Sequence, residues 1–306
     1  MTARDFFDTP VRGGRLRVAR WGSGPRRVLG LHGITASSLA LAPVARHLSP
    51  DITLIAPDLR GRGGSAALTG PYGMRTHAED CARLLEATAR GGDAPVVVVG
   101  ESMGAFVAVV LAADRPDLVD RLVLVDGGLP LPLPEGVAHA DAIPAALGPA
   151  LARLRLWFAT EQDYLDFWRV HPAFVDVWND DVEAYLRYDL AGTPPRLVSR
   201  VAEAAVEADA PETLASTDVV ASALDQLTVP IHLLRAARNL QNLTPPLIPD
   251  ELVRHWRSRV PQLTDELVPD TNHYSIMLTE PGTVAIAARI SEPGATNVPV
   301  RSEEAG

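Results

Sequence analysis

The sequence predicts an α/β fold with a mostly parallel sheet, helices on both faces of the sheet and an inserted α-helical cap. Short apolar stretches alternate with helical ones up to residue 128, the alternation stops, and it resumes near residue 226. Strands and helices that alternate at this spacing are typical of a parallel sheet covered on both sides. We therefore expect a core of residues 1–128 and 226–291, a cap of residues 129–225 and a flexible tail of residues 292–306.

The first part of the core alternates regularly between the two kinds of element. The stretch PVVVV at residues 95–99 is apolar without interruption, which is typical of a strand buried on both faces. The expected strands are residues 15–21, 27–31, 52–56, 95–99 and 121–125, and the expected helices are residues 39–48, 76–90 and 102–113.

The insertion begins with the sequence LPLPLP at residues 129–134, which cannot belong to a central strand because its prolines lack N–H donors. From about residue 138 to residue 224 the pattern is helical, with no convincing strand. The core then resumes, with strands expected at residues 229–234 and 263–268 and helices at residues 250–258 and 283–290.

Aromatic residues are concentrated in the cap. The chain has 5 Trp, 5 Tyr and 6 Phe, and nine of these lie between residues 157 and 188. Some of them are needed to dock the cap on the sheet, and the others are expected to line an apolar substrate pocket between cap and core. The residues predicted for this pocket are Gly33 from the core and Trp157, Phe158, Trp168, Trp178 and Tyr188 from the cap.

Composition argues against several classes of partner. A net charge of −10 disfavours nucleic acid and anionic membranes. The polar N-terminus lacks the apolar run of a signal peptide, and no stretch of about 18 apolar residues occurs. The single cysteine, Cys81, cannot form an internal disulfide and is expected to be a buried helix residue. We therefore expect a cytoplasmic protein.

Gly100-Glu101-Ser102-Met103-Gly104 follows a buried strand and opens a helix. A serine on such a tight strand-to-helix turn is exposed at the edge of the sheet, and flanking glycines let neighbouring backbone approach. The helix dipole places positive charge beside the serine. Ser102 is therefore the candidate nucleophile, although a serine in an ordinary turn would fit the same five residues.

A second loop, His32-Gly33-Ile34, follows the strand at residues 27–31. Nucleophilic attack on a carbonyl needs backbone N–H groups aimed at the oxyanion that develops. The N–H groups of Ile34 and Met103 are the candidate donors. His32 itself is expected to brace the loop through hydrogen bonds.

A general base for Ser102 must come from another loop that reaches the serine. Of the 8 histidines, His273 alone follows a C-terminal strand in the predicted sheet, within the sequence Asn272-His273-Tyr274. His171 in the cap is an alternative that faces the pocket, but a core or solvated histidine is the better interpretation of that position.

These motifs, in this order, resemble the α/β-hydrolase superfamily over residues 15–290. The matching segments are LHG at 31–33, APDLRGRGGS at 56–65, GESMG at 100–104, LVLVDGG at 122–128 and NHY at 272–274. The resemblance implies a serine nucleophile and assigns Asp58 and Arg60 to a structural turn.

The acid of the catalytic triad departs from the usual pattern of the superfamily. Most members have an aspartate where this chain has Asn239, and an amide cannot stabilise a histidine cation. Another subset places the acid one strand earlier, which here is Asp126, and in this the chain resembles zearalenone-type lactonases. An aspartate at this position also braces the loop in other members. The remaining candidates are Asp270 first, then Asp225 and Asp250.

The resemblance implies a serine hydrolase that cleaves a small apolar ester or lactone through an acyl-enzyme, with no metal or organic cofactor. Ser102 argues against dehalogenase and epoxide chemistry, which use an aspartate nucleophile. The alternatives are a C–C bond hydrolase, a thioesterase or amidase, a ligand receptor with weak catalysis, and a cap that supports a homodimer. Four cap arginines, Arg153, Arg155, Arg169 and Arg187, are expected to be solvated rather than to bind a substrate carboxylate.

Overall fold

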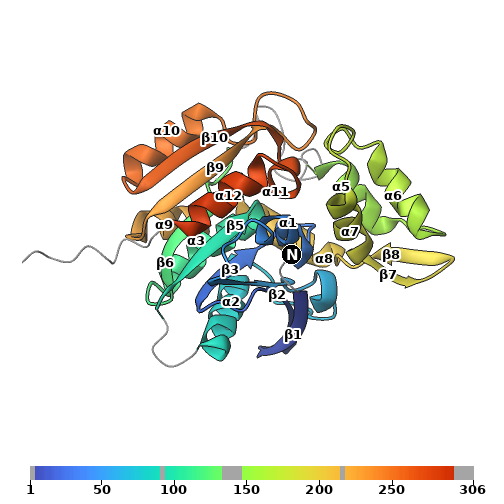
Figure 1. The fold of residues 1–306 in the computed structure, drawn as a ribbon, viewed down its shortest axis with the longest axis horizontal. Coiled ribbons are helices and arrows are strands. Elements are labelled where there is room, and N and C mark those ends of the chain that lie inside the picture. Colours follow the sequence, from blue (N-terminus) through green and yellow to red (C-terminus); the bar gives the residue numbers. More distant parts are fainter. Residues whose placement is uncertain (1–3, 90–93, 133–146, 214–217, 293–306) are drawn as a thin grey trace, which may run out of the picture.

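An eight-stranded sheet forms the centre of the computed structural model, which describes residues 4–89, 94–132, 147–213 and 218–292 (Figure 1). The strand order is β1-β2-β4-β3-β5-β6-β9-β10. β2 pairs antiparallel with β1 and β4, and all other neighbours are parallel, which confirms the predicted fold class. The strands are β1 (Arg4–Val11), β2 (Gly14–Trp21), β3 (Arg26–Leu31), β4 (Ile52–Pro57), β5 (Val96–Glu101), β6 (Val119–Val125), β9 (Ile231–Arg238) and β10 (Leu263–Asn272).

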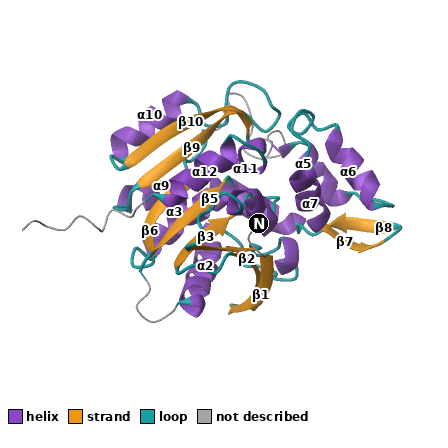
Figure 2. Cartoon of the chain, in the orientation of Figure 1, coloured by secondary structure: helices purple, strands orange, loops and turns teal. Residues whose placement is uncertain are grey.

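Helices cover both faces of the sheet, and each face has its own apolar core (Figure 2). One face carries α2 (Met74–Thr88), α3 (Met103–Asp114), α9 (Asp218–Gln226) and α10 (Asp250–Arg259). The other carries α1 (Ala42–Ala45), α11 (Ser275–Leu278) and α12 (Gly282–Ser291). α3 is buried along nearly its whole length, as expected for an apolar helix between the sheet and other helices.

Strand β1 was not predicted. Its sequence, RDFFDTPV, is polar and largely exposed because β1 is an edge strand with a single neighbour, so it lacks the apolar run that marks the central strands. The helix predicted at residues 39–48 is broken into a 3-10 turn (Ser38–Leu41) and the single turn α1, which has a proline in its first positions.

Most of the described residues between β6 and β9 project to one side of the sheet (Figure 1). They form α5 (Pro149–Ala152), α6 (Glu161–Arg169), α7 (Asp180–Tyr188), a hairpin of β7 (Leu190–Thr193) and β8 (Arg196–Ser199), and α8 (Glu203–Asp209). The expectation that this segment contains no strand was wrong, because strands of four residues are too short to show a period of two. α9, at the end of the predicted cap, packs against α3.

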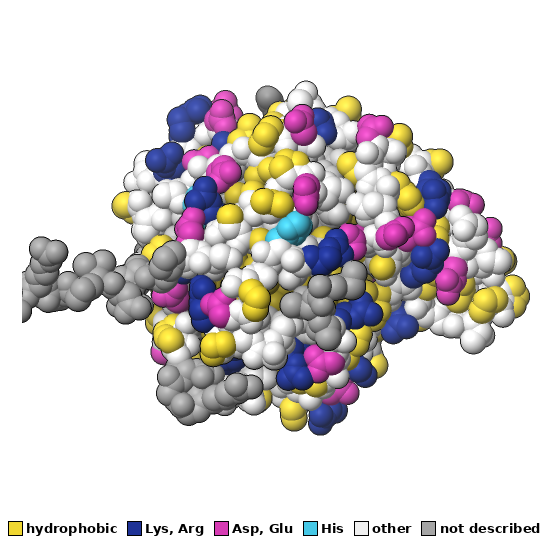
Figure 3. All heavy atoms as spheres, in the orientation of Figure 1, with side chains coloured by type: hydrophobic (Ala, Val, Ile, Leu, Met, Phe, Trp, Pro, Cys, Tyr) yellow, Lys and Arg dark blue, Asp and Glu magenta, His cyan; other side chains and the backbone are white. Residues whose placement is uncertain are grey.

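Most of the predicted tail, residues 293–306, lies outside the described residues. Among the helices that are described, none is both long and apolar enough to cross a bilayer. On the face drawn in Figure 3, acidic and basic side chains are interspersed rather than gathered into regions of one sign.

The turn after β4 is held by buried charges. Arg60 makes two hydrogen bonds to Asp80 on α2, of 2.9 and 3.0 Å, and also donates to the backbone carbonyl of Arg12. Asp58 accepts hydrogen bonds from the backbone of Ser38 and from the Tyr188 hydroxyl. Both residues therefore join distant segments, as their predicted structural role requires.

Asp80→Asn is expected to lower the free energy of unfolding by about 3–5 kcal/mol, because it leaves the Arg60 charge buried without its partner. Urea denaturation measures this change. Asp114→Asn is the matched control, since its ion pair with Arg75 is solvent-exposed and is worth about 1 kcal/mol or less. Equal losses in the two variants would contradict the assigned role of the buried pair.

Candidate active site

Ser102 lies on a sharp turn between β5 and α3, with φ 51° and ψ −120°. A positive φ is strained for a residue with a side chain, so the surrounding structure must enforce it. Gly100 and Gly104 make this possible, because a Cβ on Gly100 would collide with the carbonyl of Gly104, and one on Gly104 with the carbonyl of Leu31. The GESMG sequence thus forms the predicted turn.

The structure brings the three predicted residues Ser102, His273 and Asp126 together. Nε2 of His273 lies 3.1 Å from the Ser102 hydroxyl oxygen, and its Nδ1 lies 2.7 Å from Oδ2 of Asp126. Asp126 is fully buried after β6, and its other oxygen accepts the backbone N–H of Ala236 on β9. Asn272 accepts the N–H groups of Tyr274 and Ser275, which shapes the turn that presents His273.

The other candidates for the acid lie elsewhere. Asn239 accepts backbone N–H groups within its own loop, and the Asp270 side chain is exposed. Asp225 and Asp250 form ion pairs with Arg259 and Arg235. Of the carboxylates considered from sequence, Asp126 is the one that contacts His273.

The loop after β3 lies directly beside the serine. A Cβ on Gly33 would be 3.2 Å from the Ser102 Cβ, so the glycine allows this close approach. His32 braces the loop as predicted: its Nε2 accepts the Leu59 N–H, so its Nδ1 donates to the Gly33 carbonyl at 2.8 Å. Burial lowers the pKa of His32 to about 3, which keeps the ring neutral.

The predicted oxyanion donors are the backbone N–H groups of Ile34 and Met103, and both residues are close to Ser102 in the chain or in the cavity. Met103 is the first residue of α3, so its N–H has no partner within the helix. Ile34 follows Gly33, which lines the same cavity as Ser102. The positions of both residues suit the predicted role, which stays a prediction.

Two buried arginines, both missed as site residues from sequence, hold consecutive carbonyls of this loop. Arg62 donates from Nε to the Ile34 carbonyl at 3.0 Å and pairs with Asp209 on α8 at 2.6 Å. Arg153 donates to the Thr35 carbonyl at 2.8 Å. Arg153 also bonds Asp189 and the Tyr164 hydroxyl, so the expectation that it is solvated was wrong. Both contacts connect the segment between β6 and β9 to the loop beside Ser102.

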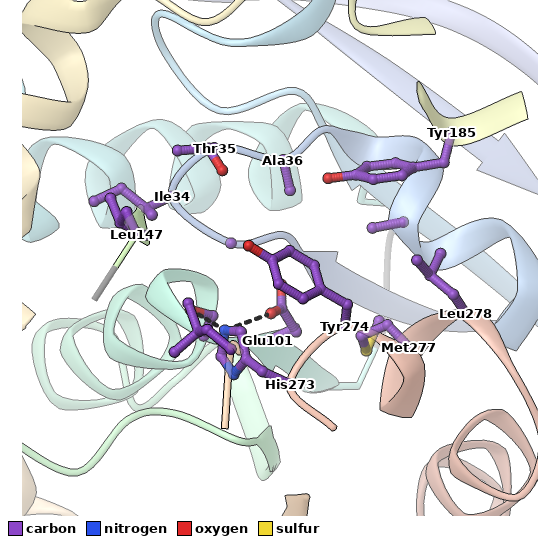
Figure 4. Close-up of a pocket in the computed structure, with 14 residues that line it drawn as sticks. Ile34, Thr35, Ala36, Glu101, Leu147, Tyr185, His273, Tyr274, Met277 and Leu278 are labelled. Atoms are coloured by element: carbon purple, nitrogen blue, oxygen red, sulfur yellow. Dashed lines mark hydrogen bonds and ion pairs between the residues drawn. The ribbon is translucent and has the colours of Figure 1, made fainter. Parts of the chain in front are cut away.

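A cavity of about 460 Å³, including its open mouth, lies over Ser102 and His273. Tyr185 of α7 and Tyr274 point into this space, and Ile34 and Leu147 lie across from them (Figure 4). The other described lining residues are mostly small or apolar: Gly33, Thr35, Ala36, Ala40, Glu101, Leu240, Met277 and Leu278.

The five cap aromatics predicted for the pocket are not among its described lining residues. Trp157 is 60% exposed, whereas Phe158 and Trp168 are buried among the rings of Tyr164, Phe167 and Phe174. Trp178 stacks with Arg169, and Tyr188 bonds Asp58. These rings pack against one another because the short helices of this segment must bury their apolar faces together. Of the predicted pocket residues, Gly33 does line the cavity.

His171 is also part of this aromatic packing rather than of the cavity lining. It lies between the rings of Trp168, Phe174 and Tyr274, and its Nδ1 accepts the Ala173 N–H. Burial lowers its pKa to about 4. His171 is therefore a core histidine rather than a solvated one.

A family model described as the alpha/beta hydrolase fold matches residues 26–279. The chain belongs to this family.

Several α/β-hydrolases of known name are similar to it. Lipase LipV of Mycobacterium tuberculosis is 38% identical over 189 residues, which cover 54% of this chain and 70% of the lipase. An esterase of the same species is 38% identical over 117 residues, 38% of either chain. The solved structure of E-2-(acetamidomethylene)succinate hydrolase superposes with a TM-score of 0.74 and 24% identity over 93% of this chain and 98% of that one, which reflects a shared fold.

The electrostatics of this α/β-hydrolase site favour a charged imidazole. Burial alone would lower the pKa of His273, but the hydrogen bond and negative charge of Asp126, joined by the charge of Glu101, outweigh it and raise the pKa above its usual value. A serine, a histidine and a carboxylate in this order can transfer the serine proton to the imidazole and stabilise the cation that forms.

Asp126→Asn is expected to lower the pKa of His273, because burial persists while the largest opposing interaction is lost. Titration of the imidazole resonances by NMR measures this shift, with His273→Gln to assign the signal. His171 does not contact Asp126, so its pKa is expected to stay near 4. An unchanged pKa of His273 would mean that Asp126 does not hold it.

Proposed function

We propose that the protein is a serine hydrolase that cleaves carboxylic esters through an acyl-enzyme. The observation that supports this most strongly is the continuous hydrogen-bonded series from Ser102 through His273 to Asp126 at the base of a cavity. Similarity to a lipase and an esterase favours an ester bond. A ligand receptor would not need a histidine positioned to remove the serine proton.

In the proposed cycle, His273 takes the Ser102 proton as the hydroxyl oxygen attacks the ester carbonyl. The N–H groups of Ile34 and Met103 stabilise the oxyanion, and the charge of Asp126 stabilises the imidazolium. His273 then gives the proton to the departing alcohol. Water attacks the acyl-enzyme by the same route, which releases the acid and restores Ser102.

The cavity favours a small apolar acyl group. Apolar surface near the serine comes from Ile34, Leu147, Leu240, Met277 and Leu278. The proposed acyl-enzyme chemistry needs no metal or organic cofactor. A lactone is the narrower proposal, because a triad acid at Asp126 would resemble the arrangement in zearalenone-type lactonases. The cytoplasmic location and the homodimer remain predictions. For the homodimer, the described cap residues offer one exposed aromatic side chain, Trp157.

Thioesters and amides are alternatives within the same chemistry, since each also yields an acyl-enzyme, and a C–C bond hydrolase uses the same three residues. A thioesterase domain from the curacin biosynthetic pathway shares the fold, with a TM-score of 0.72 and 19% identity over 94% of this chain and 99% of that one. Fold similarity alone does not choose among these bonds.

A panel of butyryl derivatives with ester, lactone, thioester and anilide bonds tests the proposal. We expect measurable turnover of the ester or lactone, because the similar proteins include a lipase and an esterase and because His273 can protonate the departing alkoxide. Ser102→Ala should reduce kcat by about 10⁴-fold or more, as loss of the nucleophile does in other triad enzymes.

Asp126→Asn serves as the second variant in the same panel and should reduce kcat by about 10³-fold or more while the protein stays folded. Circular dichroism and thermal unfolding check the fold. Preferred cleavage of the anilide or thioester would reassign the bond. Full activity of Ser102→Ala would rule out the acyl-enzyme.

A further inference from the structure

Glu101 is a buried carboxyl group that the proposed mechanism does not use. It is the last residue of β5 and immediately precedes Ser102. Its side chain is 9% exposed and lines the cavity, where Oε1 lies 3.5 Å from Nε2 of His273 (Figure 4). This nitrogen is the one that faces the Ser102 hydroxyl. Glu101 therefore lies beside the atoms that react in the proposed mechanism.

The loop after β3 leaves room for this carboxyl group. A Cβ on Gly33 would lie only 2.6 Å from Oε2 of Glu101, so a glycine is needed there to leave room for the carboxyl. The backbone of Gly33 also donates a hydrogen bond to Glu101. The carboxyl group thus lies between the base and the loop that is expected to hold the oxyanion.

Among the described lining residues, His273 is the one group facing Glu101 that can carry a positive charge. The described lining residues include neither arginine nor lysine, and the remaining titratable groups nearby are Asp126 and the hydroxyls of Tyr185 and Tyr274. Arg153 lies close to these tyrosines, but its guanidinium bonds Asp189, Tyr164 and the Thr35 carbonyl. When His273 is neutral, as it must be to accept the Ser102 proton, a second negative charge in this cavity would meet the Glu101 anion with no compensating cation among the described lining residues.

We propose that Glu101 is a specificity-determining residue that excludes esters with a carboxylate close to the scissile bond. The inference rests on the proposed ester hydrolysis and names its substrate class: acyl groups that are uncharged beside the carbonyl. Two unit charges a few ångströms apart in a partly buried site repel enough to change a rate by about tenfold or more.

The exclusion depends on pH in a defined direction. Burial raises the pKa of Glu101 to about 7, and the negative charge of Asp126 adds to this, while the charge of His273 and the Gly33 hydrogen bond oppose it. Glu101 is neutral below this pKa and ionised above it. Discrimination against anionic esters therefore strengthens as the pH rises through about 7.

The test compares monoethyl succinate with its amide, ethyl succinamate, which has the same shape without the charge. Ethanol release gives kcat/KM for each ester from about pH 6 to about pH 9, a range in which the free succinate carboxyl is ionised throughout. Both esters use the same base, so the ratio of the two kcat/KM values cancels the titration of His273. We expect the ratio of kcat/KM for monoethyl succinate to kcat/KM for ethyl succinamate to fall about tenfold from the acidic to the alkaline end of this range in the wild-type enzyme.

Glu101→Gln should make the ratio independent of pH and raise it about tenfold at the alkaline end, because the amide keeps the shape of the side chain without its charge. Glu251→Gln is the control, since that carboxylate is exposed on α10, and its ratio should fall as in the wild type.

A flat ratio in the wild type, or the same fall in Glu101→Gln, would overturn the role of Glu101 while leaving the ester hydrolysis intact. A failure of the wild-type enzyme to hydrolyse either these esters or the butyryl panel would instead overturn the proposed function and the inference with it.

Discussion

The 2.7 Å hydrogen bond between His273 and the buried carboxylate of Asp126 joins the ends of two strands that are not neighbours. β9 lies between β6 and β10, and Asp126 bridges it by accepting the Ala236 N–H with its second oxygen. Each carboxylate oxygen of the buried Asp126 thus has a hydrogen-bond partner within the protein. This arrangement orients the imidazole of His273 toward Ser102. The positive φ values of Asp126 and Ser102 place both side chains at the same edge of the sheet.

The segment between β6 and β9 contributes to this site mainly through buried charges, because most of its aromatic rings pack against one another. Asp209 and Asp189 hold Arg62 and Arg153, and these two arginines hold the Ile34 and Thr35 carbonyls. The peptide groups beside the serine are therefore oriented by hydrogen bonds that do not involve His273. Leu147 and Tyr185 are the described residues of this segment that line the cavity directly.

The central strands, Ser102 and His273 could be predicted because each has a local signature: an uninterrupted apolar run, a glycine-flanked serine, and a histidine after a late strand. Asp126 has no such signature and was predicted from the resemblance to a subset of the α/β-hydrolases. β1 could not, because an edge strand shows little apolar pattern. The cap aromatics were misplaced because composition indicates that rings are buried but not which rings they meet. Glu101 is part of the GESMG sequence, but its proposed role in specificity could not be predicted. That role depends on its proximity to Gly33 and His273, which are distant in the sequence and which the fold brings close.

The most direct test of this account is whether Ser102 is an activated nucleophile. The protein is treated with a fluorophosphonate, and the site of modification is mapped by peptide mass spectrometry in the wild type and in Ser102→Ala. The account predicts one phosphonyl adduct, on Ser102, that is absent from the variant. An adduct on another residue that persists in the variant, or no adduct on the folded wild-type protein even with a reagent small enough to enter the cavity, would contradict it.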